Sequence, residues 1–554
     1  MLKHDIVIIG GGLAGLRAAI ELNGKCDCAI ICKGYPNVAH STQAQGGINA
    51  AISPKDRWED HAYDTCYGGD YLNDQDAVEV LCSDAPRVIK EMEGMQVNFN
   101  RTQDGAVAQR AFGAQRFNRT CFAADRTGHA LLHSLYKKAL SLGVLFYNEW
   151  QVVSITKNGG EVTGVIAIDR ASGELIPIAA KAIILATGGA GRVYGKTTNP
   201  DNTGDGIALA YNAGAGIMDM EMVQFHPTTL TGCNKLLSEA ARGEGAYLLN
   251  SKGERFMKKY ASDKMELASR DVVSRAEATE IAEGRGVGLD KDSVYLDFRH
   301  LDPEIIMNRV PDIRKNAIEL VGIDIMKDPV PVQPGQHYTM AGIATDSDCK
   351  TELGGLFAAG ECACVSVHGA NRLGGNSLME TLVFGRRAGI SALKYSKDKS
   401  FSPIGDTLVK LEEERTKAWM KNGGNMPREI RIAMGKVMDK DVGPFRDEKM
   451  LVKAKLEIAK LKGAKISLGE HSSVFNADLQ SAYELFFMLT LAECTILGAL
   501  ERKESRGAHF RTDYPKRDDK NWLKHIIFRI GESGPKIGYK EVKITNFKPI
   551  ERHY

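Results

Sequence analysis

The chain has little charge imbalance, no long apolar run and no cysteine spacing typical of a metal centre. Its 72 Lys and Arg side chains nearly balance 70 Asp and Glu, which argues against nucleic acid or an anionic membrane surface as the main partner. No stretch of 18 apolar residues predicts a membrane span, and an apolar strand begins within five residues of the start, unlike a signal peptide. We expect a soluble chain in the cytoplasm.

The 11 cysteines form no Cys-x-x-Cys pair, no Cys-x-x-Cys-His motif and no four-ligand cluster. This pattern predicts no zinc, haem or iron–sulfur site, so no bound metal is expected. The thiols are predicted to be buried in a reducing compartment. A length of 554 residues suffices for about three or four domains with sizeable cores.

The first motif is a glycine turn between a strand and a helix. Residues 5–9 are an apolar run, a Gly-x-Gly-x-x-Gly pattern follows at 10–15, and residues 16–22 have helical periodicity. Such glycines let backbone N–H groups and a helix N-terminus approach a pyrophosphate, so the expected ligand is a dinucleotide. Its predicted contacts here are Gly10, Gly12, Ala14 and Gly15.

The second strand, residues 28–32, ends at Lys33. A nicotinamide-binding fold usually presents an acidic residue to the ribose hydroxyl at this point. A lysine there favours FAD over NAD, and Lys33 is predicted to lie at the cofactor.

Two more apolar strands end at glycine turns. Residues 182–189 lead to Thr187 and Gly188, before a helix that opens at Asp205, and residues 355–361 deliver Glu361, whose carboxylate suits a ribitol or ribose hydroxyl. Because strand ends so far apart in the chain are expected to meet one cofactor, they imply one sheet with a large insertion at about 231–337.

Several polar segments carry histidine or arginine beside other polar residues, and each taken singly has an ordinary explanation as a surface ion pair or local hydrogen bond. In combination they are specific. The segments are His40 six residues before Gly46-Gly47, His226-Pro227-Thr228, Ser238-Glu239, Arg242-Gly243-Glu244-Gly245, Ser269-Arg270-Asp271, His337-Tyr338-Thr339-Met340 and His368-Gly369-Ala370-Asn371-Arg372.

Together these motifs resemble the flavoprotein subunit of succinate dehydrogenase and fumarate reductase. The resemblance runs nearly end to end, through residues 504–509 and 543–545. It implies an α/β chain (α+β overall) with a Rossmann-like FAD-binding domain in two parts. The implied domains are 1–230 and 338–395 (FAD-binding), 231–337 (capping), 396–510 (helical) and 511–554 (tail).

The resemblance also implies interconversion of succinate and fumarate by hydride transfer at FAD that is covalently bound to His40. In the family, the histidyl bond raises the reduction potential of the flavin. The further cofactor contacts that match by motif are Ser41, Thr42, Gln45, Gly46, Gly47, Asn376, Ser377 and Leu378.

Carried over by motif, His226 and Ser238 would bind one substrate carboxylate, and His337 and Arg372 the other. Charged donors at both ends fix a four-carbon dianion and polarise its double bond. Phe112 would pack near the substrate. Arg270 matches the proton donor and acceptor, relayed through Glu239 and Arg242, although an arginine pKa above about 12 requires any neutral form to be transient.

The chain departs from the family pattern at some positions. Ser238 replaces a frequent Thr and keeps the hydroxyl, and alanines stand at 114, 240, 241 and 246 where the family often has Gly or Cys. The alanines put the fine pocket shape in doubt, and with it an unsubstituted substrate. Gln45 occurs both in dehydrogenases and in quinol-linked reductases, so the direction of the reaction is open.

The implied partners are an iron–sulfur subunit, docked near residues 123–136, and through it membrane anchor subunits and a quinone. This places the chain at the inner face of the cell membrane. Rival readings are an L-aspartate oxidase-like flavoprotein, which would lack the covalent bond at His40, a thiol-driven fumarate reductase of the methanogen type, and a non-enzymatic flavin-bearing scaffold.

Two C-terminal features are predicted from composition. Residues 481–500 form the most apolar run of the helical region, yet Glu484 and Glu493 within it favour a packed helix over a membrane span. Residues 537–554 are basic and strand-like, and are expected to lie over either this chain or a partner.

Overall fold

A seven-stranded sheet holds the three predicted glycine-tipped strands side by side. In the computed structural model, which describes residues 2–532 and 534–553, β1 (Leu2–Ile9) lies between β2 (Cys28–Cys32) and β9 (Leu175–Leu185), and β16 (Leu356–Ala358) pairs with the far edge of β9. All these pairings are parallel. Such strands are buried on both faces, which explains why their sequences read as continuous apolar runs. The predicted α/β class is confirmed.

The rest of this sheet is partly antiparallel. β6 (Leu145–Asn148) continues it beyond β2, while β7 (Trp150–Asn158) and β8 (Glu161–Asp169) form an antiparallel extension beside β9. The strand predicted at 182–185 is therefore only the end of the 11-residue β9, because the chain stays extended through the polar Lys181.

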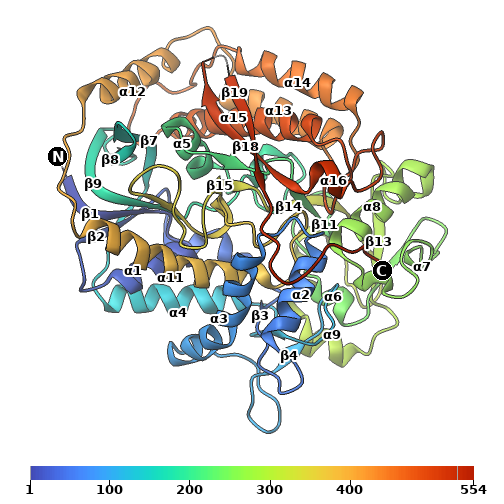
Figure 1. Ribbon diagram of the computed structural model, residues 1–554. Coiled ribbons are helices and arrows are strands. Elements are labelled where there is room, and N and C mark those ends of the chain that lie inside the picture. The colour runs from blue at the N-terminus through green and yellow to red at the C-terminus, as the bar shows by residue number, and fades with distance from the viewer. Residues whose placement is uncertain (1, 533, 554) are drawn as a thin grey trace.

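Helices α1 and α11 cover one side of the sheet, with α4 packed against α1 and α3 against α11, as Figure 1 shows for α1, α4 and α11. Asp74 directly precedes α3, and Arg126 directly precedes α4. The bounds are α1 (Leu13–Leu22), α3 (Gln75–Gly94), α4 (Thr127–Ser141) and α11 (Asn376–Ser396).

Two glycines let α1 and α11 approach closely. A Cβ atom at Gly385 would lie 2.6 Å from the Ala14 carbonyl oxygen, and one at Gly389 would lie 3.0 Å from that of Ala18. Side chains at these positions would push the helices apart. Their contact therefore depends on backbone packed against backbone.

The insertion forms its own sheet and apolar core. β11 (Val223–Leu230), β14 (Val330–Thr339), β13 (Val294–Asp297) and β12 (Tyr247–Leu249) pair in that order, with helices α8 (Arg270–Glu280), α9 (Pro303–Arg309) and α10 (Pro311–Val321) around them. A separate cluster of buried residues fills this unit. We call residues 223–339 the capping segment. It extends slightly beyond the predicted 231–337, because β11 and β14 pair with each other.

The helical region shares the main apolar core. Buried residues of its helices belong to one cluster with β1 and β9, and so does α5. The predicted region 396–510 therefore has no core of its own. The helices of this region are α12 (Asp406–Trp419), α13 (Pro427–Asp441), α14 (Glu448–Lys462) and α15 (Ala477–Glu501), and α5 (Asp205–Ala213) comes from the FAD-binding part of the chain.

The apolar helix α15 is long and apolar enough to cross a membrane by length and composition. In this structure 67% of its most apolar window is buried within the protein, and Figure 1 shows it among the other helices at the top of the view. The packed helix predicted from Glu484 and Glu493 is present.

The C-terminal segment ends as an irregular tail. β18 (Lys524–Gly531) and β19 (Gly534–Glu541) form a hairpin at the edge of a five-stranded sheet. The strand-like prediction for 537–554 is wrong beyond Glu541, and Tyr554 lies outside the described residues. The tail runs over this chain, where Gln75 accepts from three successive backbone N–H groups, those of residues 545–547.

The remaining elements are short. Those other than 3₁₀ and π turns are α2 (Trp58–Gly68), β3 (Ile48–Asn49), β4 (Gln109–Arg110), β5 (Thr120–Cys121), β10 (Ile217–Met218), α6 (Ala240–Gly243), α7 (Met257–Tyr260), β15 (Gly342–Ala344), β17 (Ala363–Cys364) and α16 (Asp519–Trp522).

Each of the 11 cysteines is a free thiol. Most are buried as predicted, but Cys233 is exposed because it lies in the turn that follows β11. Among the residues that the structure describes, no three His, Cys, Asp or Glu side chains are placed to hold a metal ion.

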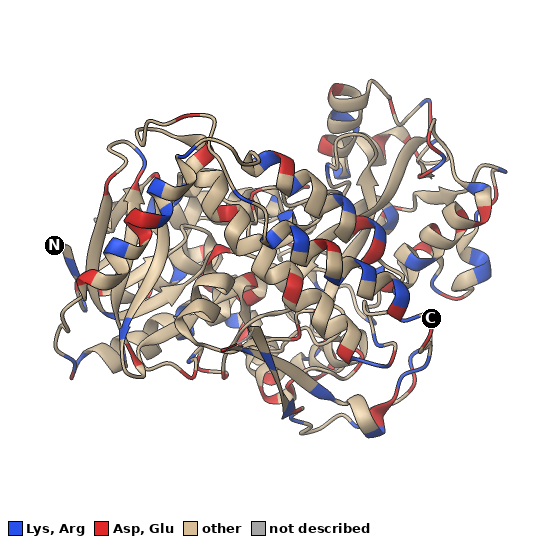
Figure 2. Ribbon diagram, turned by 90° about the horizontal axis from the view of Figure 1, so that it is seen from above, with Lys and Arg blue, Asp and Glu red and all other residues tan. Residues whose placement is uncertain are grey.

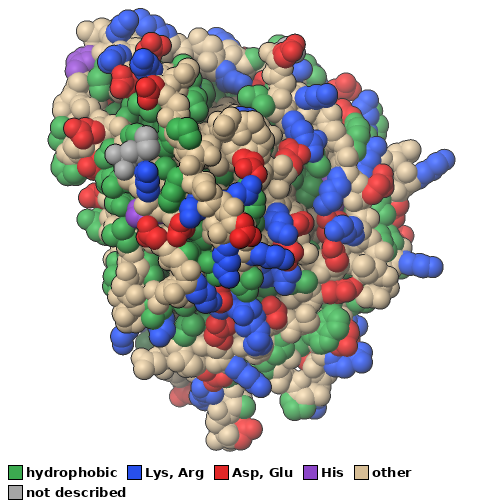
Figure 3. Space-filling view, turned by 60° about the vertical axis from the view of Figure 1, so that its left-hand side comes forward, with side chains coloured by type: hydrophobic (Ala, Val, Ile, Leu, Met, Phe, Trp, Pro, Cys, Tyr) green, Lys and Arg blue, Asp and Glu red, His purple; other side chains and the backbone are tan. Residues whose placement is uncertain are grey.

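Charges of both signs are interspersed along the helices in Figure 2 and over the face shown in Figure 3. The interior holds ion pairs as well. Arg502, fully buried, lies 2.7 Å from Glu221 and 3.2 Å from Glu504, and so joins the end of α15 to the segment before β11.

We expect Arg502→Met to lower the free energy of unfolding by about 3–5 kcal/mol, because it leaves the buried Glu221 carboxylate without its cation, although Glu504 keeps Arg506 at 2.8 Å. The matched control is Arg529→Met, which removes an exposed pair with Glu352 and should cost about 1 kcal/mol or less. Thermal and urea unfolding of both variants measure the difference. Equal losses would contradict a stabilising role for the buried network.

Candidate functional site

A cavity of about 530 Å³ opens between the main sheet and the capping segment. The cofactor residues predicted from sequence that line it are Gly10, Gly12, Ala14, Lys33, His40, Ser41, Gln45, Gly46, Gly47, Thr187, Gly188, Glu361, Ser377 and Leu378. The predicted substrate and catalytic residues that line it are Phe112, His226, Ser238, Glu239, Arg270, His337 and Arg372.

In the glycine turn after β1, only one of the three motif glycines, Gly12, has open space beside it for a ligand. Gly10 has φ +108° and a Cβ there would meet the Ala186 carbonyl oxygen at 2.3 Å, while a Cβ at Gly15 would lie 2.0 Å from the Gly10 carbonyl oxygen. At Gly12 the nearest atom is the Ser41 hydroxyl, 3.6 Å away. The first and third glycines therefore serve packing, and the second leaves room for a pyrophosphate.

Two helix N-termini point at this cavity. Gly12 is the N-cap of α1 and Gly375 the N-cap of α11, and both line it. Unpaired N–H groups and the helix dipole make such ends favourable for phosphate or for a flavin ring that gains negative charge. The cradle fits a flavin dinucleotide.

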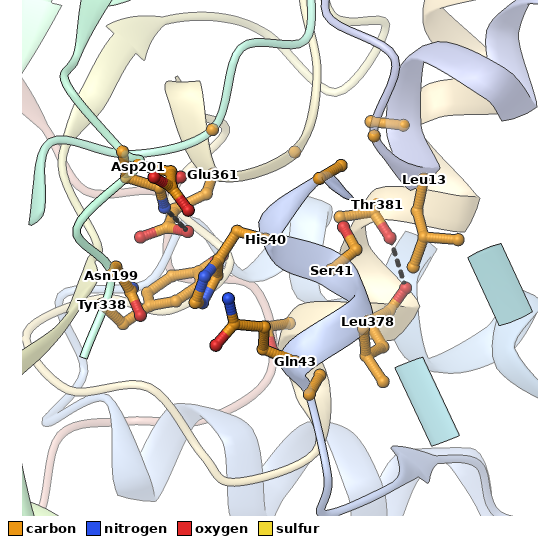
Figure 4. A pocket seen from close by; sticks show the side chains of 18 of the residues that line it. Leu13, His40, Ser41, Gln43, Asn199, Asp201, Tyr338, Glu361, Leu378 and Thr381 are labelled. Atoms are coloured by element: carbon orange, nitrogen blue, oxygen red, sulfur yellow. Dashed lines mark hydrogen bonds between the residues drawn. The ribbon is translucent and has the colours of Figure 1, made fainter. Parts of the chain in front are cut away.

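His40 extends into the cavity from a 3₁₀ helix, His40–Gln43. In Figure 4 its ring points toward Tyr338 and Asn199, with Leu13, Leu378 and Thr381 on the other side. Burial, and to a smaller degree the nearby Lys235 cation, lowers the pKa of His40 to about 4. The ring is therefore neutral at physiological pH, and its buried Nδ1 has no partner within residues 2–532 and 534–553.

Glu361 closes the same side of the cavity (Figure 4). One carboxylate oxygen accepts from the Thr339 N–H at 3.0 Å and the other from the Asn202 amide at 3.3 Å. Burial raises the pKa of Glu361 to about 7. A hydroxyl group of a bound cofactor would provide the hydrogen bonds that favour its ionised form.

Five predicted residues do not line the cavity: Gly15, Thr42, Asp205, Asn376 and Arg242. The Thr42 hydroxyl donates to the Ala39 carbonyl, and the Asn376 amide oxygen accepts from Asn49. These side chains shape the backbone of the cradle and do not face a ligand.

Asp205 acts through Lys33. The Lys33 ammonium lies 3.0 Å from Asp205 and 2.8 Å from Glu484 of α15. Burial opposes the charge, but the two carboxylates outweigh it and raise the pKa of Lys33. Lys33 therefore lines the cavity while its charge is shared with the helical region, a partnership that the sequence did not indicate.

The residues of the predicted substrate clamp converge. The His226 and His337 rings lie 4.9 Å apart between centroids. The Nδ1 of His226 accepts from the Thr228 N–H at 3.2 Å, which assigns the proton of the neutral ring to Nε2. Burial first, and then the Arg270 cation, hold the pKa of His226 well below its usual range. Its Nε2–H is buried, has no partner in the part of the chain that the structure describes, and is available to a ligand.

Arg372 contributes a cation to the same space. Its guanidinium carbon lies 4.2 Å from the centroid of the Tyr338 ring, and its Nη1 donates to the Ser377 hydroxyl at 3.1 Å. Burial, reinforced by the nearby Arg270, lowers the pKa of Arg372 to about 10, so it stays cationic. Its Nε is buried with no partner among the described residues.

Arg270 is held by two acceptors. Its Nε donates to Glu239 at 2.7 Å and its Nη1 to Gln224 at 2.9 Å. Glu239 also accepts from the Gly113 N–H at 2.8 Å and lies 3.8 Å from Arg242. Burial opposes ionisation, yet the cations lower the pKa of Glu239. The three residues of the predicted proton relay, Arg270, Glu239 and Arg242, are thus neighbours in space.

Phe112 fits between two glycines. A Cβ at Gly46 would lie 2.5 Å from its ring and one at Gly374 would lie 2.6 Å from it. The ring thereby separates the loop that carries His40 from the loop that carries Arg372.

Comparisons with known proteins agree with this geometry. Residues 5–378 match the FAD binding domain family, and residues 431–554 match the fumarate reductase flavoprotein C-terminal family. The chain is 42% identical to the succinate dehydrogenase flavoprotein subunit of Rickettsia conorii, over 100% of this chain and 98% of that protein. The chain belongs to the succinate dehydrogenase and fumarate reductase flavoprotein family.

A fumarate reductase flavoprotein subunit of Mycobacterium tuberculosis is equally similar, at 42% identity over 100% of this chain and 99% of that one. The fold superposes on the FrdA chain of E. coli quinol fumarate reductase with a TM-score of 0.96 and 38% identity, over 100% of this chain and 99% of that chain. Membership of this flavoprotein family confirms the resemblance and supports FAD as the cofactor. Succinate dehydrogenase and fumarate reductase subunits match this chain equally well, so the similarity does not distinguish succinate oxidation from fumarate reduction.

Sequence reasoning omitted two residues of this flavoprotein site. Gln224 binds Arg270, and Tyr338 lies against Arg372. The signal for Gln224 was present, because residues two apart on a strand share a face and Gln224 precedes His226 by two. Tyr338 follows His337 directly, and no spacing rule distinguishes it from a core tyrosine.

We expect Gly12→Ala to keep the stability of the FAD-free chain and to lose most bound flavin, because its methyl group has room in the protein but occupies the cradle. Gly15→Ala is the matched contrast and should lower the unfolding temperature itself, since its Cβ overlaps a carbonyl oxygen. Thermal unfolding and flavin content per chain measure both. Normal flavin content in Gly12→Ala would show that the turn does not hold the cofactor.

Proposed function

We propose that this chain interconverts succinate and fumarate at a bound FAD. The observation that carries the proposal is the convergence of Arg372, His226 and His337 on one cavity, with Arg270 held beside them by Glu239. We also propose that residues 231–337 are a capping domain over the substrate, between the two parts of the FAD-binding domain at 1–230 and 338–395, with a helical domain at 396–510 and a tail at 511–554. FAD, when bound, supplies the two-electron exchange with the substrate.

The clamp explains how a dicarboxylate is oriented. The Nε2–H of His226 and the hydroxyl of Ser238, which accepts from the Ala240 N–H at 3.2 Å, face one end of the cavity as donors. Arg372 and His337 serve the other end. Donors at both ends bind a dianion and draw electron density toward the carboxylates, which activates the double bond between them.

Arg270 is suited to move the proton. With Nε on Glu239 and Nη1 on Gln224, its Nη2 has no partner among the described residues. In fumarate reduction Nη2 gives a proton to the substrate carbon, and the neutral guanidine that remains is reprotonated through Glu239, which takes a proton from Arg242 and passes it on to Arg270. Succinate oxidation runs the same transfers backward. Proximity to a dianion keeps the arginine cationic at rest.

The test is an assay of the purified, flavin-loaded chain with fumarate and a reduced viologen dye. The wild type should turn over, and Arg270→Ala should lower kcat about a hundredfold to ten-thousandfold, as for the loss of a positioned general acid. Arg372→Ala should mainly raise KM, because a clamp binds the ground state as well.

Near-normal kcat in Arg270→Ala would remove it from the mechanism. A wild-type chain that binds FAD yet leaves both fumarate and succinate untouched would contradict the function and favour the scaffold reading. The same assays, repeated with L-aspartate as the substrate, test the alternative of an L-aspartate oxidase-like flavoprotein.

We further propose that FAD is covalently joined to His40. Its support is a neutral ring inside the cofactor cavity with an unpartnered nitrogen. Acid-precipitated protein should stay yellow and keep in-gel flavin fluorescence. His40→Ser should bind FAD without the bond, reduce fumarate and lose succinate oxidation, since the flavin potential falls. Flavin that washes out of the denatured wild type would refute the bond.

An iron–sulfur subunit, docked near α4, and a membrane anchor with a quinone complete the proposed assembly, at the inner face of the membrane. Its support is the similarity to a chain of a quinol–fumarate reductase with menaquinol molecules, at 39% identity and a TM-score of 0.95. In the fumarate assay, the single chain should therefore be inactive when a water-soluble quinol replaces the dye.

A further inference from the structure

The irregular tail after β19 reaches the start of α8 in the capping segment. Figure 1 shows the red C-terminal segment running to the green capping helices. The Arg552 side chain, 10% exposed, donates to Asp271 at 2.9 Å and to the Gly68 carbonyl oxygen at 3.2 Å, and lies 3.2 Å from Asp70. One guanidinium thus joins the capping segment to the loop after α2.

Asp271 directly follows Arg270 in the first turn of α8. Its buried carboxylate also accepts from Arg275 at 3.1 Å and from the Asn371 amide at 3.1 Å. Burial opposes its charge, but Arg552 and then Arg275 outweigh burial and keep the pKa of Asp271 below its usual range. The carboxylate is a charged anchor at the base of the Arg270 side chain.

A chain of hydrogen bonds, closed by the peptide bond between Arg270 and Asp271, connects this anchor to the substrate clamp. Gln224 donates to the Asn371 amide oxygen and to the Arg372 carbonyl oxygen, both at 2.8 Å, and accepts from Arg270 at 2.9 Å. Arg270, Gln224, Asn371 and Asp271 form a ring between the two walls of the cavity. Arg552 fastens this ring from outside and does not itself line the cavity.

We infer that Arg552 is a positioning residue for Arg270. It fixes the first turn of α8 against the loop that carries Arg372, so that the proposed proton donor and the clamp keep their relative positions. The inference rests on the proposed function for the role of Arg270. The contact of the tail with α8 is independent of it.

The ring has other anchors, so the loss of Arg552 alters position more than folding. Asp271 keeps Arg275 and Asn371, and Asp70 keeps Arg517 at 2.8 Å. A shift of about 1 Å in a catalytic group can cost about a hundredfold in rate. The expected signature is therefore a kcat effect in a folded, flavin-loaded protein.

The experiment compares Arg552→Ala and Arg552→Lys with Arg529→Ala, the exposed control, in the flavin-loaded full chain. For dye-driven fumarate reduction, Arg552→Ala should lower kcat about tenfold to a hundredfold and change KM about threefold or less. Arg552→Lys should recover part of the rate, since one cation can still meet Asp271, and Arg529→Ala should match the wild type.

Hydrogen exchange of the peptide that covers residues 266–280 gives a readout without turnover. Exchange there should be faster in Arg552→Ala, with unchanged flavin content and unfolding temperature. A kcat within twofold of the wild type, or losses of flavin and stability that parallel the loss of rate, would overturn the inference. If the wild type is inactive but exchange in Arg552→Ala is faster as expected, the proposed function is overturned instead.

Discussion

The close contact of α1 with α11 is the constraint on which the cofactor site depends. Gly385 and Gly389 bring the α11 backbone against the carbonyls of Ala14 and Ala18. Because the helices are packed this closely, their N-terminal ends reach the same cavity, one after β1 and the other after the loop of Arg372. A single packing contact thereby brings the dinucleotide turn and the substrate clamp into one space.

The second wall of that space belongs to another folding unit. The capping segment has its own apolar core, yet it contributes His226, Glu239 and Arg270. Burying an arginine is costly unless acceptors surround it. Glu239 and Gln224 meet that requirement and at the same time fix the direction in which the guanidinium faces, so stability and orientation have the same origin.

Much of this arrangement could be predicted from local patterns. Apolar strands that end in glycine turns predicted the sheet and the cofactor edge, and motif resemblance brought His226, His337 and Arg372 to one site. Local patterns carried no information on contacts between remote charges. Lys33 with Glu484, Asp205 acting through Lys33, and Asp271 with Arg552 join segments hundreds of residues apart, and an ion pair leaves no periodic signal in either segment. Nor did the sequence indicate that the helical region shares the main core, because an apolar helix face does not specify the element it packs against.

The burial of α15 has a consequence for the newly made chain. Its 25 residues meet the length and apolarity of a membrane span, and packing against α5, α12, α13, α14 and the 3₁₀ turn Gly191–Val193 covers them. Until those helices are in place, the segment exposes apolar surface that bilayers, insertion machinery and other unfolded chains all bind. Glu484 and Glu493 within it raise the cost of insertion into lipid, and so help to keep the newly made chain in water.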